Sequence, residues 1–367
     1  MKKGAVRVED RRAPPPSAFR VACPRGWFGV GYDPTPNHEQ PVGEAAVQAS
    51  SSPSWGGVVP VQGPSKAVAR PVSQRTMGCY GVGSYPTGGN APPLASPYSS
   101  TVPEGHTIHR LARDHARFFR GQRLSVSSPQ GRFADSARLL DGSVLEAADA
   151  YGKHLFLRFE GKRFVHVHLG LFGKLLFGPL PAPEPRGALR LRLSGDEAYS
   201  DLRGPTVCAL LTPDERRSVF ARLGPDPLRR DADPARAYAR LARSRQPIAR
   251  LLMDQTVLAG VGNVYRAELL FLHKLDPFLP GASVGEERWE SIWADLKDRM
   301  QAGVRANRIV TTRPEHRSRA TGRVLRADAA YVYRRAGDPC RVCRSEVRSQ
   351  LLAGRTLYWC PTCQPPA

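Results

Sequence analysis

The chain has 367 residues, enough for two or three domains. Its 54 Lys and Arg residues against 33 Asp and Glu residues give a net charge of +21, which predicts a polyanionic partner, nucleic acid before an anionic membrane surface. No apolar run reaches about 18 residues, which excludes a membrane-spanning helix, and the basic start lacks the apolar core of a secretory signal. We therefore expect a cytoplasmic protein that does not bind membranes; solubility alone is the other explanation of the charge.

Residues 1–102 are rich in Pro, Gly and Ser and show no sustained hydrophobic period. Such a composition buries too little apolar surface to offset the entropy of ordering the backbone, so we predict a disordered extension. The character of the chain changes at Val102, and Pro103-Glu104-Gly105 follows. A proline that begins a chain is a secondary amine and a nucleophile, whereas the same proline inside a chain is an amide.

An alternation of helical and strand patterns follows this break. Apolar residues recur at helical spacing over residues 106–120, and Gly121 marks a stop. Short alternating runs then predict an antiparallel sandwich or barrel, with strands at 124–127, 144–148, 154–159, 164–169, 175–177 and 189–193. Further helices are expected from 213 to 224, beginning with a capping box at Thr212, and at 235–242, 248–258, 264–272 and 289–300. Residues 311–328 are Arg-rich and irregular.

Four of the seven cysteines form two C-x2-C pairs near the C-terminus, Cys340 with Cys343 and Cys360 with Cys363. Two such pairs separated by about 15–20 residues have the spacing of a tetrathiolate zinc site. Two disulfides are the alternative, which suits a secreted mini-domain better. We predict one structural Zn²⁺ per chain and free thiols at Cys23, Cys79 and Cys208.

Two features outside the cysteines indicate phosphate binding. The turn Gly260-Val261-Gly262-Asn263 separates two predicted helices, and a helix N-terminus with free N–H groups binds anions. Arg355 lies between the two cysteine pairs, where a hairpin turn can hold it against a phosphate. Taken alone, the first favours an ordinary helical hairpin over an anion site, and the second is often only a solvated arginine. Beside a basic zinc module, phosphate binding gains. Tyr358 and Trp359 are expected to be the core of that hairpin.

In combination, these motifs resemble the formamidopyrimidine-DNA glycosylase / endonuclease VIII family of bifunctional DNA repair glycosylases. The resemblance extends from Pro103 to Gln364 and includes Pro-Glu-Gly-His-Thr, Tyr-Gly-Lys-His-Leu, His-Leu-Gly-Leu-Phe-Gly, Gly-Val-Gly-Asn-Val-Tyr-Arg and the final Cys-Pro-Thr-Cys-Gln. The Pro-Glu-Gly start looks like the endonuclease VIII side, in an actinobacterial branch. It implies an α+β multidomain fold: an N-terminal helix and two-sheet antiparallel β-sandwich (103–211), a helix–two-turn–helix domain (212–330) and a zinc-finger hairpin (331–367).

The resemblance also implies a chemistry and its residues. Pro103 would attack C1′ of a flipped-out nucleotide and form an iminium, Glu104 would shuttle the proton that opens the sugar, and Lys153 would contact the lesion phosphate. Oxidised bases, pyrimidines first, would be excised and the strand cut by β,δ-elimination. Asn263 and Arg355 match phosphate-binding positions, Leu171 and Phe172 match the loop that fills the vacated space, and Arg203 matches a contact to the opposite strand. For Leu171 and Phe172, a buried turn between strands is an equally good interpretation. His106 and His109 are expected to have structural roles.

One departure from the family pattern affects this chemistry, because family members begin at the proline whereas residues 1–102 precede Pro103 here. Three explanations are open: a misassigned start codon at Val102, proteolytic removal of the extension, or a chain that binds lesions without cutting them. We expect the first, with the working protein beginning at Pro103.

Three classes of protein therefore compete. The first is a monomeric glycosylase and lyase acting on damaged duplex or partly single-stranded DNA, associated with a bacterial nucleoid. The second is a zinc-containing DNA-binding protein without catalysis, and the third an RNA-associated zinc protein, which leaves Pro103, Glu104 and Lys153 unexplained.

Overall fold

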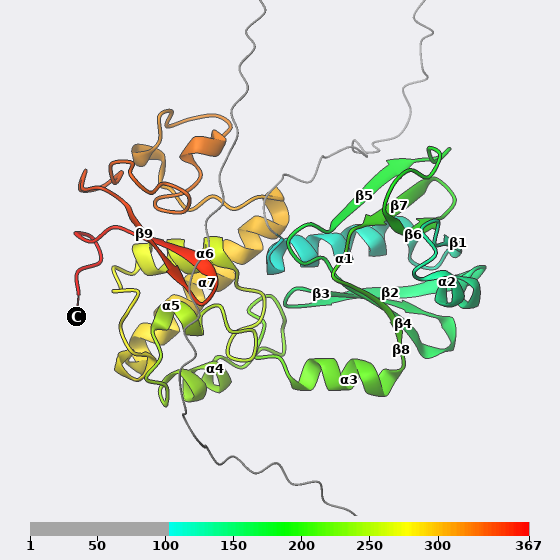
Figure 1. The fold of residues 1–367 in the computed structure, drawn as a ribbon, viewed down its shortest axis with the longest axis horizontal. Coiled ribbons are helices and arrows are strands. Elements are labelled where there is room, and N and C mark those ends of the chain that lie inside the picture. Colours follow the sequence, from blue (N-terminus) through cyan, green and yellow to red (C-terminus); the bar gives the residue numbers. More distant parts are fainter. Residues whose placement is uncertain (1–102, 367) are drawn as a thin grey trace, which may run out of the picture. The chain divides into compact units, whose positions relative to one another are not determined.

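A computed structural model describes residues 103–366 (Figure 1). The extension predicted to be disordered lies outside the described residues, together with Cys23, Cys79 and the C-terminal Ala367. Among residues 103–366, no helix combines the length and the apolar character needed to cross a membrane.

The first helix, α1 (Gly105–Phe119), forms where helical spacing predicted it. The side chains of Ile108, Leu111, His115 and Phe119 recur at intervals of three or four and are buried on one face. Two residues later Gly121 takes a φ of +83°, which a glycine adopts without strain and which ends the helix. The buried face of α1 is part of the core of the N-terminal half.

Eight strands form a continuous antiparallel array in the order β5-β7-β6-β1-β2-β3-β4-β8. Strand β1 pairs with β2 through its first two residues and with β6 through its last three, so the array divides into two layers at β1. Figure 1 shows α1 beside both layers, and one core cluster draws residues from α1 and from strands of each layer. The strand bounds are β1 Arg123–Ser127, β2 Ser143–Tyr151, β3 His154–Phe159, β4 Arg163–His168, β5 Lys174–Pro179, β6 Leu189–Ser194, β7 Ala198–Arg203 and β8 Val207–Leu211. The predicted sandwich is confirmed.

Three elements of this half were not predicted. Helix α2 (Ala134–Leu140) is short and has no side-chain cap, so its sequence carries little helical signal. Strand β7 buries Ser200 and Asp201, and the carboxylate of Asp201 pairs with Arg192. A strand with buried polar residues lacks the hydrophobic alternation that identifies strands in sequence. Strand β8, the third, follows the Gly204-Pro205 turn and pairs with β4.

The second half is helical, and its first helix confirms the predicted capping box. In α3 (Pro213–Ala221) the Thr212 hydroxyl accepts from the Glu215 amide, and the Glu215 carboxylate accepts from the Thr212 amide. The remaining α-helices are α4 Pro234–Leu241, α5 Ile248–Leu251, α6 Asn263–Leu272 and α7 Glu286–Ala306. Trp289, Ile292, Leu296 and Met300 form the predicted buried stripe of α7.

The helix predicted over residues 248–258 was wrong in extent, because α5 ends at Leu251. Asp254 accepts hydrogen bonds from the amide and hydroxyl of Thr256, a local turn that competes with helix continuation. The Gln255 side chain bonds the carbonyls of Met253 and Val261 and the amide of Gly260. These bonds fold residues 253–261 into a compact turn ahead of α6.

The C-terminal segment is a two-stranded hairpin of β9 (Arg348–Leu352) and β10 (Arg355–Trp359). Tyr358 and Trp359 pack against neighbouring cores, which confirms the structural role predicted for them. Residues 311–328 are irregular as predicted, with short 3-10 turns at Pro314–His316 and Arg326–Asp328. Glu268 on α6 fixes both ends of this region, since its carboxylate accepts from the Thr311 hydroxyl and from the amides of Tyr331, Val332 and Tyr333.

Candidate active site

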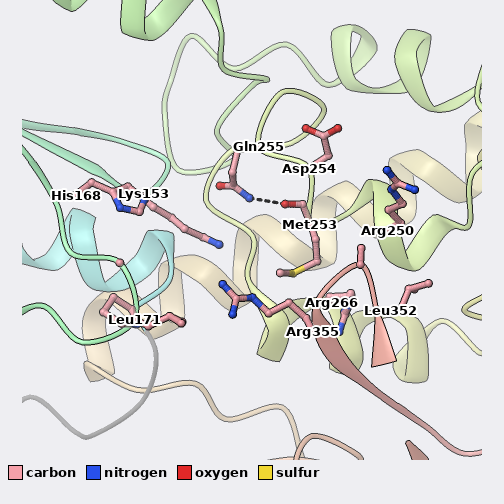
Figure 2. Close-up of a pocket in the computed structure, with 13 residues that line it drawn as sticks. Lys153, His168, Leu171, Arg250, Met253, Asp254, Gln255, Arg266, Leu352 and Arg355 are labelled. Carbon is pink, nitrogen blue, oxygen red and sulfur yellow. Dashed lines mark hydrogen bonds between the residues drawn. The ribbon is translucent and has the colours of Figure 1, made fainter. Parts of the chain in front are cut away.

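A pocket of about 440 Å³ contains Pro103 and Lys153 in its wall. Figure 2 shows the Lys153 amine and the Arg355 guanidinium pointing toward the same space. The other residues that line the pocket are His168, Gly170, Leu171, Arg250, Met253, Asp254, Gln255, Arg266, Leu352 and Ala353. Strand ends, the turn ahead of α6, α6 itself and the zinc hairpin therefore all contribute to one site.

Glu104 lies beside Pro103, and its carboxylate is buried at the N-terminus of α6. It accepts hydrogen bonds from the amides of Val264 (2.8 Å), Gly262 (3.0 Å) and Tyr265 (3.4 Å). The prediction that the amides of this helix N-terminus bind a phosphate was wrong for these three, because the protein's own carboxylate accepts from them. The phosphate contact predicted for Asn263 stays a prediction. Gly262 is required here, since a Cβ at that position would lie 2.3 Å from Cδ of Glu104.

The environments of Glu104 and Lys153 shift both groups toward their neutral forms. Burial raises the pKa of Glu104, against the opposing effects of the Lys153 charge and the three backbone amides. Burial also lowers the pKa of Lys153, opposed by Glu104 and assisted by Arg355. A carboxyl group that keeps its proton to higher pH can deliver it to a substrate, which is the property a general acid needs.

Lys153 lies in a two-residue turn between β2 and β3, whose ends pair as Tyr151 with His154. Gly152 occupies the first turn position with a φ of +57°, the conformation for which glycine is favoured in tight hairpins. The Gly152 amide donates to the buried carboxylate of Asp226 at 2.7 Å. The backbone that carries the lysine is thus held from the opposite side by a residue of the helical half.

The zinc hairpin is joined to α6 by two side chains. The Asn263 amide group donates to the Thr356 carbonyl at 2.9 Å, and the Arg266 guanidinium donates to the same carbonyl at 3.0 Å and to the Asn263 side-chain oxygen. Arg266 is buried, which lowers its pKa to about 10. Arg355 is exposed and follows directly on the hairpin turn. Within the pocket, Lys153, Arg266 and Arg355 form a basic lining.

The loop between β4 and β5 projects two apolar side chains. Phe172 is 84% exposed and Leu171 is 41% exposed, and Leu171 also lines the pocket. These exposures differ from those of a buried sheet turn, the alternative weighed from sequence. Arg203 lies outside the pocket wall on β7, where its guanidinium donates to Asp201 at 3.1 Å and to the Arg186 carbonyl.

The four C-terminal cysteines form a metal site. Their Sγ atoms lie within 4.8 Å of one another, with Cys340 3.9 Å from Cys363 and Cys343 3.4 Å from Cys360. A tetrahedron with zinc–sulfur bonds of about 2.3 Å separates sulfurs by roughly 3.8 Å, whereas a disulfide requires about 2.05 Å. The geometry therefore fits the predicted tetrathiolate zinc and excludes the disulfides. Cys208, the fifth described cysteine, is a free thiol as predicted.

Several site residues escaped prediction. His168 and Arg266 line the pocket, and both lie within motifs that were recognised for other residues. Asp226 carried no local signal. His106 has the structural role expected of it, because it is buried, packs edge-on against Tyr265, and has its pKa lowered to about 3 by burial.

Comparison of the chain with known proteins shows the family to which it belongs. The formamidopyrimidine-DNA glycosylase N-terminal domain matches residues 102–208, the H2TH domain of the same glycosylase matches residues 223–314, and the zinc finger found in FPG and IleRS matches residues 337–366. "Endonuclease 8 1" of Mycobacterium tuberculosis is 54% identical over 267 residues, with 72% of this chain covering 100% of that protein. The chain belongs to the formamidopyrimidine-DNA glycosylase / endonuclease VIII family.

As a member of this family, the chain is a DNA repair glycosylase and lyase. "Endonuclease 8 2" of Mycobacterium bovis is 33% identical over 270 residues and is covered over 100% of its length by 72% of this chain. Among solved structures, the Lactococcus lactis Fpg in complex with abasic-site DNA matches the fold with a TM-score of 0.61 at 21% identity, covering 72% of this chain and 100% of that one. The predicted resemblance is confirmed, including its endonuclease VIII side.

Proposed function

We propose that this glycosylase excises oxidised bases, pyrimidines first, through an iminium formed by the amine of Pro103. The nitrogen of Pro103 attacks C1′ and the bond from C1′ to the base breaks, so the base leaves with the bonding electrons and takes up the proton that the amine loses. Glu104 donates a proton to the ring oxygen, the sugar opens, and the nitrogen–carbon double bond forms. Loss of a C2′ proton then expels the 3′ phosphate, and a second elimination expels the 5′ phosphate.

The observation that carries this proposal is the convergence of Pro103, Lys153 and Arg355 on one pocket, with a buried Glu104, whose pKa is raised by burial, adjacent to the proline. A basic lining suits the phosphates on either side of a flipped nucleotide. Lys153 is proposed to contact the lesion phosphate, and Asn263 and Arg355 to hold the kinked backbone. Leu171 and Phe172 are proposed to enter the stack in place of the extruded base, and Arg203 to contact the opposite strand.

The proposed active form begins at Pro103. In the 367-residue chain the nitrogen of Pro103 is acylated by Val102 and has no free lone pair. Relatives matched over their whole length correspond to only 72% of this chain, and the N-terminal domain match begins at residue 102. A chain of that extent is a complete protein among the relatives, which supports a foldable enzyme that begins at Pro103. We further propose that it acts as a monomer on damaged duplex or partly single-stranded DNA of a bacterial nucleoid.

Borohydride trapping on DNA with a single oxidised pyrimidine tests the proposal, using the 367-residue chain and a chain that begins at Pro103. Only the latter should give a covalent complex, because only it has a free proline amine. Equal trapping of both would place the nucleophile elsewhere, for example on a lysine. The same blocked nitrogen favours a second function for the 367-residue chain, a binder of damaged DNA that does not cleave it; this predicts similar affinities of the two chains for an uncleavable abasic analogue.

A lesion panel tests the base preference separately. The chain that begins at Pro103 should release oxidised pyrimidines faster than oxidised purines from duplexes of otherwise identical sequence. The reverse order would refute the pyrimidine assignment while leaving the proline chemistry intact.

A further inference from the structure

The buried carboxylate of Asp226 joins two segments that both belong to the catalytic apparatus. Its Oδ2 atom lies 2.7 Å from Nε2 of His109 on α1 and 2.7 Å from the amide of Gly152, the residue before Lys153. Its Oδ1 atom accepts from the amide of Leu228 at 2.9 Å, and the Asp226 side chain has no exposed surface. A carboxylate can accept several donors at once, and a buried one is costly unless it does so.

The segment around Asp226 is itself fixed to the structure on either side of it. Gly224 donates to the Gln255 carbonyl at 2.9 Å, and Ala259 donates to the Pro225 carbonyl at 3.1 Å. The Tyr151 hydroxyl, at the end of β2, donates to the Gly224 carbonyl at 3.0 Å. Asp226 therefore projects from a rigid support at the junction of the helical half with the lysine turn.

The N-terminus of α1 has an independent anchor. Glu104 is bound to the amides of α6, and the Gly105 amide donates to the Gly260 carbonyl at 2.8 Å. Losing the bonds of Asp226 would therefore leave Pro103 and Glu104 in place and release chiefly the turn that carries Lys153. Asp226 contacts the lysine turn at the Gly152 amide, so it acts on the lysine through the backbone.

We propose that His109 and Asp226 are positioning residues that set the place of the Lys153 turn relative to Pro103. This inference rests on the proposed function, in which Lys153 engages the lesion phosphate. Misplacing a catalytic group by about 1 Å can cost about 100-fold in rate. Neither residue touches the pocket, so both act through Gly152.

A double-mutant cycle tests the proposal in the chain that begins at Pro103. Asp226→Asn presents an amide N–H group where one of the three donors needs an acceptor, and should slow single-turnover excision about 10- to 100-fold at saturating DNA. In a Lys153→Ala background the same change should cost less than about threefold, because the group being positioned is gone. Equal costs in both backgrounds would overturn the proposal in favour of general destabilisation.

Two variants of His109 keep the proposal testable if Asp226→Asn does not fold. His109→Leu removes the donor, whereas His109→Gln retains an N–H group near the position of Nε2. The glutamine variant should recover most of the rate that the leucine variant loses, and equal loss in both would count against the hydrogen bond. Asp141→Asn is the matched control, since Asp141 accepts from the Val126 amide at 2.7 Å away from the pocket and should leave the rate unchanged.

Hydrogen exchange of the full chain without DNA separates this proposal from the proposed function. The segment 149–155 should exchange about tenfold faster in His109→Leu than in the wild type, and unchanged in Asp141→Asn. That result supports the positioning role even if no covalent DNA complex is ever trapped. Unaltered exchange of this segment in His109→Leu would overturn it, whatever the activity.

Discussion

The close approach of Gly262 to Glu104 gives a sharp test of the catalytic arrangement. A Cβ at position 262 would lie 2.3 Å from Cδ, 2.5 Å from Cγ and 2.6 Å from Oε1 of Glu104. Ordinary carbon–carbon contact begins near 3.5 Å, so Gly262→Ala must displace the carboxyl group by about 1 Å or more. The φ of Gly262 is −121°, which alanine adopts freely, so the effect comes from the collision and not from backbone strain.

Such a displacement breaks hydrogen bonds from amides that lie 2.8–3.4 Å from the carboxylate. The group proposed to protonate the sugar would then be misplaced by about 1 Å, for which about 100-fold is the expected loss of rate, equivalent to about 2.7 kcal/mol in the barrier. Binding of an uncleavable abasic analogue should change by less than about threefold, since Lys153, Arg266 and Arg355 keep their positions.

Gly285→Ala is the matched control. Gly285 is the N-cap of α7 as Gly262 is of α6, its φ is −65°, and a Cβ there meets nothing within 4 Å. Any general cost of placing alanine at an N-cap should therefore appear in both variants. Single-turnover excision and borohydride trapping measure the difference. A Gly262→Ala enzyme that cleaves within about threefold of the Gly285→Ala enzyme would refute the assignment of Glu104 as the proton donor in this geometry.

Three further predictions concern stability and binding. Burial lowers the pKa of His115 from 6.5 to about 4, so the contribution of the neutral imidazole to stability is complete above pH 6.5 and is lost as the pH falls toward 4. Urea titrations should show the free energy of unfolding of the wild type, relative to that of His115→Phe, falling by about 2 kcal/mol between pH 7.5 and pH 5. A difference that stays constant with pH would contradict a neutral buried imidazole. Chelating the zinc should abolish DNA binding while leaving the circular dichroism of the sandwich, since Arg355 depends on the hairpin; retained affinity would exclude a role for the hairpin. Arg243 and Arg245 are exposed and form no ion pair within the described residues. Replacing both by Ala should lower the slope of log DNA affinity against log salt concentration by up to about 2. Arg138 pairs with Asp135, so Arg138→Ala is the control and should leave that slope unchanged.

Local patterns in the sequence predicted those parts of the fold that local interactions determine. The apolar stripe of α1, the Thr212 capping box and the paired cysteines each depend on residues a few positions apart, and each was found where expected. The helix expected at 248–258 was overestimated because the apolar period continues past Leu251 while Asp254 forms a turn. Strand β7 was missed because its buried polar residues depend on partners from another strand.

The site was predictable only through its motifs, because its geometry depends on contacts between distant segments. Asp226 is 117 residues from His109 and 74 from Gly152, so no spacing in the sequence links them. A long separation in sequence also explains why a phosphate was predicted at the glycine turn. Its free amides correctly indicated an anion, but nothing local distinguishes a phosphate from a carboxylate 158 residues away.

The carboxylate of Glu104 lies where a phosphate was expected, at the N-terminus of α6, and this affects how the enzyme can bind DNA. The amides of Gly262, Val264 and Tyr265 are bonded to Glu104. In the proposed complex we therefore expect the phosphate contacts to come from the side chains of Lys153, Asn263 and Arg355. Of these, Asn263 and Arg355 belong to elements joined at the Thr356 carbonyl, whereas Lys153 belongs to the sandwich. A phosphate bound by all three would bridge the lysine turn, which Asp226 holds, and α6, where Glu104 is already fixed. The anchoring of Glu104 thus makes α6 the fixed reference of the site, against which both the substrate and the lysine are placed.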